Sequence, residues 1–148
     1  MNDGILLHEE LDRYITKFGN LPDWFSNVKL GKGRTEQKLV ARYNDIFELS
    51  GMMDYLDTEN GVIYDWKFGT TSALDWAGTW QMPLYFLICD LLEIPVKSGR
   101  IIRHNQYEKK TDWCVVHNTK SARELIENVI ETVGNDAYLF FEREGLLT

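Results

Sequence analysis

The chain has 148 residues, of which 44% are hydrophobic, and it carries a net charge of −7. The apolar content suits one buried core, whereas the negative charge counts against a large non-specific nucleic-acid surface. The two cysteines, Cys89 and Cys114, exclude a cysteine zinc site or a four-cysteine iron–sulfur cluster within the chain.

The first half of the chain predicts one helix and three strands. Apolar residues recur at helical spacing from Leu7 to Phe18, and Gly19-Asn20 with Pro22 ends that helix. Residues 21–34 are predicted to be irregular. Strand patterns and turn residues then predict a strand from about residue 36 to Tyr43, a turn at Asn44-Asp45, a second strand over 46–56, an Asn60-Gly61 turn and a third strand over 61–68.

The second half predicts helices on either side of a hairpin. Ser72 with Asp75 marks a helix start, and Pro83 predicts a start or a kink near Gln81 in a helix over 81–92. A hairpin is expected over 99–104 and 111–117. For the last helix we predict a capping box of Ser121 and Glu124 and a buried stripe of Leu125, Ile126, Val129, Ile130 and Val133. This order of elements predicts an α/β fold with a central mixed β-sheet flanked by α-helices, in one domain over 1–148.

The stretch from Gly51 to Phe68 carries the chemistry. Strand side chains alternate, so Asp65 and Lys67 point to one face and Trp66 to the other. Asp54 lies on the preceding strand, so two carboxylates can meet one hard cation such as Mg2+ or Mn2+. The carbonyl of Trp66 can add an oxygen ligand, and Lys67 can hold an attacking water. These parts predict phosphodiester hydrolysis.

Several other residues keep more than one interpretation. Glu48 precedes Asp54 by an even number of residues and is a candidate accessory ligand. His104 and His117 are predicted to lie on the surface. Three tryptophans, Trp66, Trp76 and Trp80, are predicted to be core residues, although an exposed tryptophan can stack on single-stranded DNA. Two basic clusters fit either a solvated face or a phosphate track: Lys29, Lys32, Arg34 and Lys38, and then Arg100, Arg103, His104, Lys109 and Lys110.

Four short motifs in order resemble those of the PD-(D/E)xK nucleases in their RecB-like branch, which carry G-x-x-x-H, G-x-x-D, D-x-K and Q-x-x-x-Y. The resemblance covers about residues 4–90 and implies a restriction-endonuclease-like core. Unlike some relatives, this chain lacks the cysteines for an iron–sulfur cluster. Its matching motifs are Gly4-Ile5-Leu6-Leu7-His8, Gly51-Met52-Met53-Asp54, Asp65-Trp66-Lys67 and Gln81-Met82-Pro83-Leu84-Tyr85.

The resemblance implies a role for each matching polar residue. Asp54 and Asp65 ligate the metal, His8 is a further ligand from the first helix, and Lys67 positions the nucleophilic water. Gln81 and Tyr85 orient Lys67 or the substrate phosphates. Without the resemblance, His8 fits a buried core histidine, and Gln81 and Tyr85 fit helix packing. Glu36 resembles a glutamate often found at the start of the first strand, and we do not count it as a ligand.

The resemblance therefore implies a Mg2+- or Mn2+-dependent deoxyribonuclease, an exonuclease acting on DNA ends or single-stranded DNA in recombination, repair or viral and mobile-element DNA processing. We expect self-association or a recombination-protein partner. The first residues do not resemble a signal peptide, and the sequence has no apolar run long enough to span a membrane. We therefore expect a cytoplasmic location, which for a viral protein is the host cytoplasm. Two alternatives stay open: a non-catalytic DNA-end-binding subunit of a recombination complex, and a metal-dependent hydrolase of RNA or nucleotides.

Overall fold

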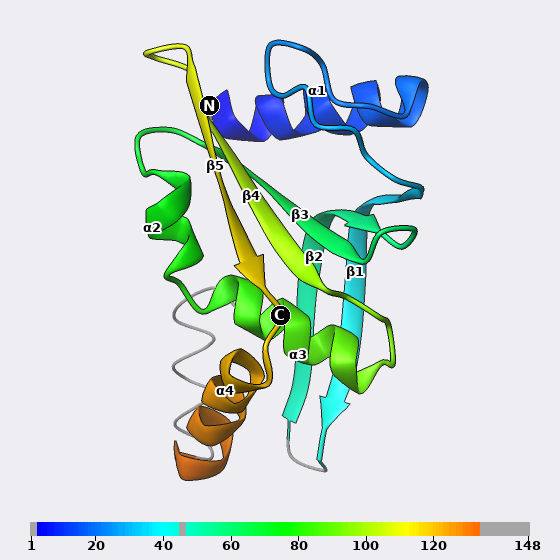
Figure 1. The fold of residues 1–148 in the computed structure, drawn as a ribbon, viewed down its shortest axis with the longest axis vertical. Coiled ribbons are helices and arrows are strands. Elements are labelled where there is room, and N and C mark those ends of the chain that lie inside the picture. The colour runs from blue at the N-terminus through cyan, green and yellow to red at the C-terminus, as the bar shows by residue number, and fades with distance from the viewer. Residues whose placement is uncertain (1–2, 45–46, 134–148) are drawn as a thin grey trace.

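The computed structural model describes residues 3–44 and 47–133. Figure 1 shows the first helix at one end of the molecule and the last helix at the other, with the strands between them. Within the described ranges, no helix is both long and apolar enough to cross a membrane. The elements are α1 (Asp3–Phe18), β1 (Gly33–Tyr43), β2 (Phe47–Asp57), β3 (Val62–Phe68), α2 (Ala73–Ala77), α3 (Gln81–Leu91), β4 (Ser98–Asn105), β5 (Lys110–His117) and α4 (Lys120–Val133).

The five strands form a mixed sheet in the order β1-β2-β3-β4-β5. The β1–β2, β2–β3 and β4–β5 pairs are antiparallel, whereas β3 and β4 are parallel. A parallel pair needs a crossover connection, and α2 and α3 lie in the connection between β3 and β4. The predicted order of elements and the mixed sheet are therefore confirmed.

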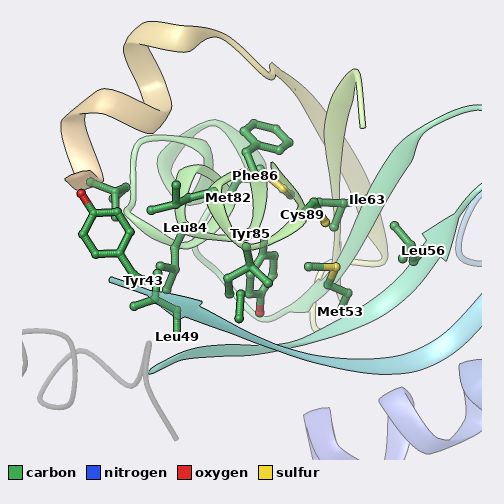
Figure 2. Close-up of a cluster of buried hydrophobic side chains, with 14 of the residues drawn as sticks. Tyr43, Leu49, Met53, Leu56, Ile63, Met82, Leu84, Tyr85, Phe86 and Cys89 are labelled. Atoms are coloured by element: carbon green, nitrogen blue, oxygen red, sulfur yellow. The ribbon is translucent and has the colours of Figure 1, made fainter. Parts of the chain in front are cut away.

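Two apolar clusters cover the two faces of the sheet. Adjacent strand residues point to opposite faces, and Ile101 belongs to one cluster while Ile102 belongs to the other. On the first side, called the α3 face, residues from Met82 to Cys89 pack on the strands and on α4, as Figure 2 shows for several of them. On the second side, called the α1 face, Leu11 and Ile15 pack on the strands together with the loop after α1.

The helix starts follow the local sequence. Ser72 caps α2 by accepting the N–H of Asp75 at 3.1 Å, as predicted. Pro83 is the third residue of α3, where its missing N–H would have no partner inside the helix. The proline therefore marks a helix start and not a kink.

The prediction for the last helix is wrong in two details. The hydroxyl of Thr119 accepts the N–H of Ala122 at 3.1 Å, so Thr119 is the cap in place of Ser121 with Glu124. Threonine is also a favoured cap, and the chain turns into the helix soon after β5 ends at His117. Leu125 is 52% exposed, whereas Ile126 and Ile130 are buried and Val129 packs partly buried against the same cluster, as predicted.

Some predictions need adjustment or cannot be compared. β1 starts at Gly33, so the irregular segment ends two residues earlier than predicted. Asp45, Ile46 and the side chain of Val133 lie outside the described residues.

A buried carboxylate fixes the loop that leads into β1. Asp57 at the end of β2 is fully buried and accepts the N–H of Gly31 at 2.9 Å and the N–H of Asn60 at 2.8 Å. The side-chain amide of Asn60 donates to the same carboxylate at 3.0 Å. A Cβ on Gly31 would lie 2.4 Å from Asp57 Oδ1, so only glycine lets the loop approach this closely.

We predict that Asp57→Ala destabilises the protein by about 2 kcal/mol or more, because two backbone N–H groups and the Asn60 amide lose a buried, charged acceptor. The free energy of unfolding in urea measures the loss. Glu59→Ala removes an exposed carboxylate from the same turn and should cost less than about 1 kcal/mol. Equal losses in the two variants would contradict the anchoring role.

Candidate active site

Asp54 and Asp65 lie where β2 and β3 stop pairing. The β2–β3 pairing ends at Tyr55 and Tyr64, and the two aspartates are the next residues along the strands. In place of a backbone ladder bond, Asp54 Oδ2 accepts the N–H of Trp66 at 2.7 Å. The two carboxylates therefore occupy a gap that opens between neighbouring strands.

Asp65 is 3% exposed, and its Oδ2 lies 3.1 Å from Lys67 Nζ. Although the ammonium is this close, Asp65 Oδ2 has no hydrogen-bond donor in good geometry among the described residues. Burial raises the pKa of Asp65, and the neighbouring Asp54 carboxylate raises it further against the opposing charge of Lys67. Asp65 and Lys67 share a face of β3, as predicted, and Trp66 points into the α1-face cluster.

His8 reaches the same gap from α1. Its Nδ1 lies 2.8 Å from the carbonyl oxygen of Gly4, and its Nε2 lies 2.8 Å from that of Trp66. Carbonyl oxygens only accept, so both ring nitrogens donate and the ring is a charged imidazolium. Its Nε2 is 3.7 Å from Asp54 Oδ2. Burial alone would lower the pKa of His8, but the Asp54 carboxylate and the two carbonyls outweigh it and raise the pKa to about 9.

These side chains line one cavity of about 440 Å3. Its wall includes His8 from α1, Asp54 from β2, Gln81 from α3 and, from β3, Asp65, Lys67 and Phe68. A larger cavity of about 490 Å3 lies at the other end of α1, but the residues that line it include no carboxylate or histidine. The smaller cavity is therefore the candidate active site.

Gln81 and Tyr85 connect α3 to β2 beside the cavity. The Gln81 side-chain amide donates to the Tyr85 hydroxyl at 3.0 Å, and that hydroxyl donates to the carbonyl of Met52 at 3.0 Å. Gln81 faces the cavity, while Tyr85 is buried behind it. This placement makes Tyr85 a support for the strand that carries Asp54.

Gly51 and Tyr85 are packed against each other. A Cβ on Gly51 would lie 2.5 Å from Tyr85 Cε1, which is too close for any larger residue. Figure 2 shows Tyr85 among the buried side chains around α3. The glycine of the G-x-x-D motif therefore leaves room for the tyrosine of the Q-x-x-x-Y motif.

Trp76 on α2 is a site residue that the sequence did not single out. The Lys67 ammonium lies 4.2 Å from the centroid of a Trp76 ring, within the range of a cation–π contact. Trp76 and Trp80 are partly buried against the α3-face cluster, and Trp66 is 2% exposed. A tryptophan in a short amphipathic helix gives no signal that it will cover a lysine on a strand.

Other acidic and histidine candidates are placed differently. Glu36 has φ +46° and interrupts the β1–β2 pairing between Thr35 and Gln37. Burial and the Asp12 and Asp54 carboxylates raise its pKa. Glu48 is exposed opposite Arg42, towards the other end of β2, and the structure does not bring it to the cavity.

The two late histidines differ. His117 is exposed, as predicted. His104 lies at the surface but is half-buried, because one side of its ring packs near Trp24 and Phe25, with ring centroids at 5.3 Å and 6.4 Å.

The donors at the cavity fit a hard divalent cation. Asp65 Oδ2 is buried and lacks a well-placed donor, and the Asp54 carboxylate and the Trp66 carbonyl line the same cavity. Among residues 3–44 and 47–133, no three His, Cys, Asp or Glu side chains lie close enough together to hold a metal ion by themselves. The imidazolium of His8 supplies positive charge beside Asp54 in the metal-free arrangement.

Comparisons with known proteins agree with this fold. A sequence model described as the PD-(D/E)XK nuclease superfamily matches residues 6–139, and no curated protein matches the chain. The crystal structure of SSO0001 is similar at 12% identity and a TM-score of 0.55, with 87% of this chain and 58% of that chain covered. This chain therefore spans less than two thirds of SSO0001.

The crystal structure of an alkaline exonuclease, LHK-Exo from Laribacter hongkongensis, is similar at 10% identity and a TM-score of 0.55. That match covers 97% of this chain and 71% of the exonuclease. At such identities the likeness is one of fold. With the family match, it confirms the restriction-endonuclease-like α/β core predicted from the sequence.

We predict that His8 titrates near pH 9 in the metal-free protein, whereas burial and Arg103 place the pKa of His104 below its usual value. The folded pKa of His8 lies above the unfolded value of about 6.5. Its stabilising contribution is therefore complete below about pH 6.5 and is lost as the pH rises through about 9.

Histidine ring NMR signals followed against pH in EDTA measure both midpoints. The unfolding free energy of the native protein minus that of His8→Gln should be larger at pH 6 than at pH 10. A His8 midpoint at or below its ordinary value would show that the ring is not the charged donor described above.

Proposed function

Because the chain belongs to the PD-(D/E)XK nuclease superfamily, we propose that it is a divalent-metal-dependent nuclease that hydrolyses DNA phosphodiester bonds. One observation carries the proposal: carboxylates from neighbouring strands, Asp54 and Asp65, meet the Lys67 ammonium and His8 in one cavity. We place the chain in the RecB-like branch, because its G-x-x-x-H and Q-x-x-x-Y motifs bring His8 and Gln81 to that cavity.

Asp54, Asp65, the Trp66 carbonyl and His8 would hold the cation, and we propose Mg2+ or Mn2+ because most of these donors are oxygens. A cation bound there would neutralise charge on the scissile phosphate and lower the pKa of a water. His8 must then give up its Nε2 proton, because a protonated nitrogen cannot ligate.

Lys67 is held for the attacking water. Asp65 fixes the ammonium on one side at 3.1 Å and Trp76 covers another, so its remaining N–H groups are directed at the cavity. In the reaction the water oxygen forms a bond to phosphorus, and the bond from phosphorus to one sugar oxygen breaks. The proton lost by the water passes to solvent, and the departing sugar oxygen gains a proton. Gln81 lies at the wall where the phosphate would enter.

We propose an exonuclease acting on DNA ends or single strands. The similarity of fold to an alkaline exonuclease supports this choice. We further propose that the chain is one domain with a cytoplasmic role in recombination, repair or viral DNA processing, and that self-association or a protein partner retains DNA between cuts.

We predict that Asp54→Asn, Asp65→Asn and Lys67→Gln each slow DNA digestion at least about a hundredfold, because each removes charge at the reacting phosphate. Labelled linear, circular and single-stranded DNA with Mn2+ or EDTA give the rates and separate exonuclease from endonuclease activity. Calorimetric Mn2+ binding should weaken in the two aspartate variants.

Glu48→Gln is the matched control, since it removes an exposed carboxylate from the same strand, and it should digest DNA at the native rate. If Asp65→Asn digested DNA at the native rate, the proposed active site would be wrong. Binding of DNA without digestion by the native chain would favour the non-catalytic end-binding subunit.

We predict that Trp76→Leu lowers kcat about tenfold while KM for DNA and Mn2+ affinity stay unchanged, because the ring positions Lys67 and touches neither ligand. Trp76→Phe keeps an aromatic face and should recover most of the rate. Trp80→Leu, which alters a tryptophan packed on the same cluster, controls for packing. If Trp76→Phe were as slow as Trp76→Leu, the loss would be one of packing.

A further inference from the structure

We propose that the α1 face of β4 and β5 binds single-stranded DNA by stacking bases on exposed tryptophan rings. We call this surface the β4–β5 aromatic face and define it by Trp24, Arg100, His104 and Trp113. The inference rests on the proposed nuclease function, because it names the form of DNA that the same active site takes.

The sheet register places these side chains together. Ile102 packs in the α1-face cluster and pairs directly with Trp113, so Trp113 lies on the same face. Arg100 and His104 lie two residues to either side of Ile102 on β4 and share this face. α1 itself packs on β1 and β3, towards the β1 edge of the sheet, and so leaves this face of β4 and β5 uncovered by α1.

The tryptophans are large apolar surfaces in contact with solvent. Trp113 is 61% exposed, and the Arg100 guanidinium lies 4.8 Å from the centroid of its ring. Trp24 is 41% exposed, and its ring meets His104 edge-on at 5.3 Å. Flat exposed rings with a stacked arginine are the features that hold successive bases of a single strand, because every base has a π-face.

A row of neighbouring rings leads from the catalytic cavity to the β4–β5 aromatic face, and Phe25 in the middle of this row is buried. Phe68 lines the cavity and lies 5.0 Å from the ring of His8. The ring of Phe25 is 5.6 Å from Phe68 and 5.8 Å from Trp24. A strand that leaves the cavity past Phe68 therefore reaches Trp24 first and Trp113 beyond it.

The charges of this face suit a phosphate backbone. Arg100 lies on it and Lys109 lies in the turn after β4, whereas Lys110 pairs with Asn105 on the other face. Arg103 turns to the α3 face, where it pairs with Asp112 at 2.8 Å. The second basic cluster of the sequence is thus divided by strand alternation, and only part of it is directed at DNA.

Single-stranded DNA fits this face better than duplex DNA does. Stacking needs free base faces, and a duplex buries them against neighbouring base pairs. The β4–β5 aromatic face also carries fewer cationic side chains than a duplex-binding surface needs to contact successive phosphates.

The test is fluorescence anisotropy of a labelled thymidine oligonucleotide and of a duplex of equal length, in EDTA so that no cleavage occurs. We expect Trp113→Ala and Trp24→Ala to weaken binding of the single strand about tenfold each, while the duplex is little affected. Trp113→Phe should recover most of the affinity. Unfolding curves show that each variant is folded.

Phe18→Ala is the matched control. Phe18 is 56% exposed and carries the Lys17 ammonium 5.2 Å from its ring centroid, so it is another exposed ring with a cation, at the opposite end of α1 from His8. Its variant should bind the single strand normally. Equal losses at Phe18 and Trp113, equal losses for single strand and duplex, or unchanged binding in both folded tryptophan variants would each overturn the inference.

The proposed function fails by a separate result. If the native chain binds single strands through Trp113 in EDTA but digests no DNA with Mn2+, the nuclease proposal is wrong and the stacking face stands. If it digests DNA while the tryptophan variants bind normally, the reverse holds.

Discussion

Two carboxylates held in a poorly solvated gap are the constraint on which the site depends. Asp54 and Asp65 repel each other, and burial adds to the cost of keeping both charged. The fold compensates from three directions: the Trp66 N–H reaches Asp54, the Lys67 ammonium reaches Asp65, and His8 brings a positive ring from α1. The compensation is incomplete, since one oxygen of Asp65 keeps no well-placed donor among the described residues. Uncompensated charge of this kind lowers stability and is typical of functional sites.

Elements with a clear period could be predicted from the sequence, whereas contacts between distant elements could not. Alternation along β3 points Asp65 and Trp66 to opposite faces of the sheet. Four motifs in order predict that His8, Asp54 and Gln81 meet, and these residues line one cavity. The cover of Lys67 by Trp76 depends on how α2 folds back on the sheet, which local pattern does not encode. The predictions for the α4 cap and for Leu125 fail for a related reason: Thr119 and Ser121 can both cap a helix, and packing against the rest of the fold decides which side of the helix is buried.

The two faces of the sheet divide the work of the molecule. The α3 face contains the larger apolar cluster, the Arg103–Asp112 pair and the side of β3 that carries Asp65 and Lys67. The α1 face carries His8, the aromatic cluster around Phe25 and the exposed rings of Trp24 and Trp113. Because successive residues of β4 alternate between these faces, a count of basic residues overstates the charge at any one surface. An acidic chain can in this way keep a small cationic and aromatic area beside a carboxylate cavity.

The contact between Gly51 and Tyr85 constrains how these two positions can change in evolution. The two residues belong to different motifs, yet the side chain of one occupies the volume that the other lacks. A lineage that enlarges position 51 must shrink or lose the ring at position 85, and with it the hydroxyl that holds Gln81 and the Met52 carbonyl. The pair should therefore be inherited together or replaced together. A relative that has exchanged both would carry a differently supported cavity wall even where its aspartates and lysine are intact.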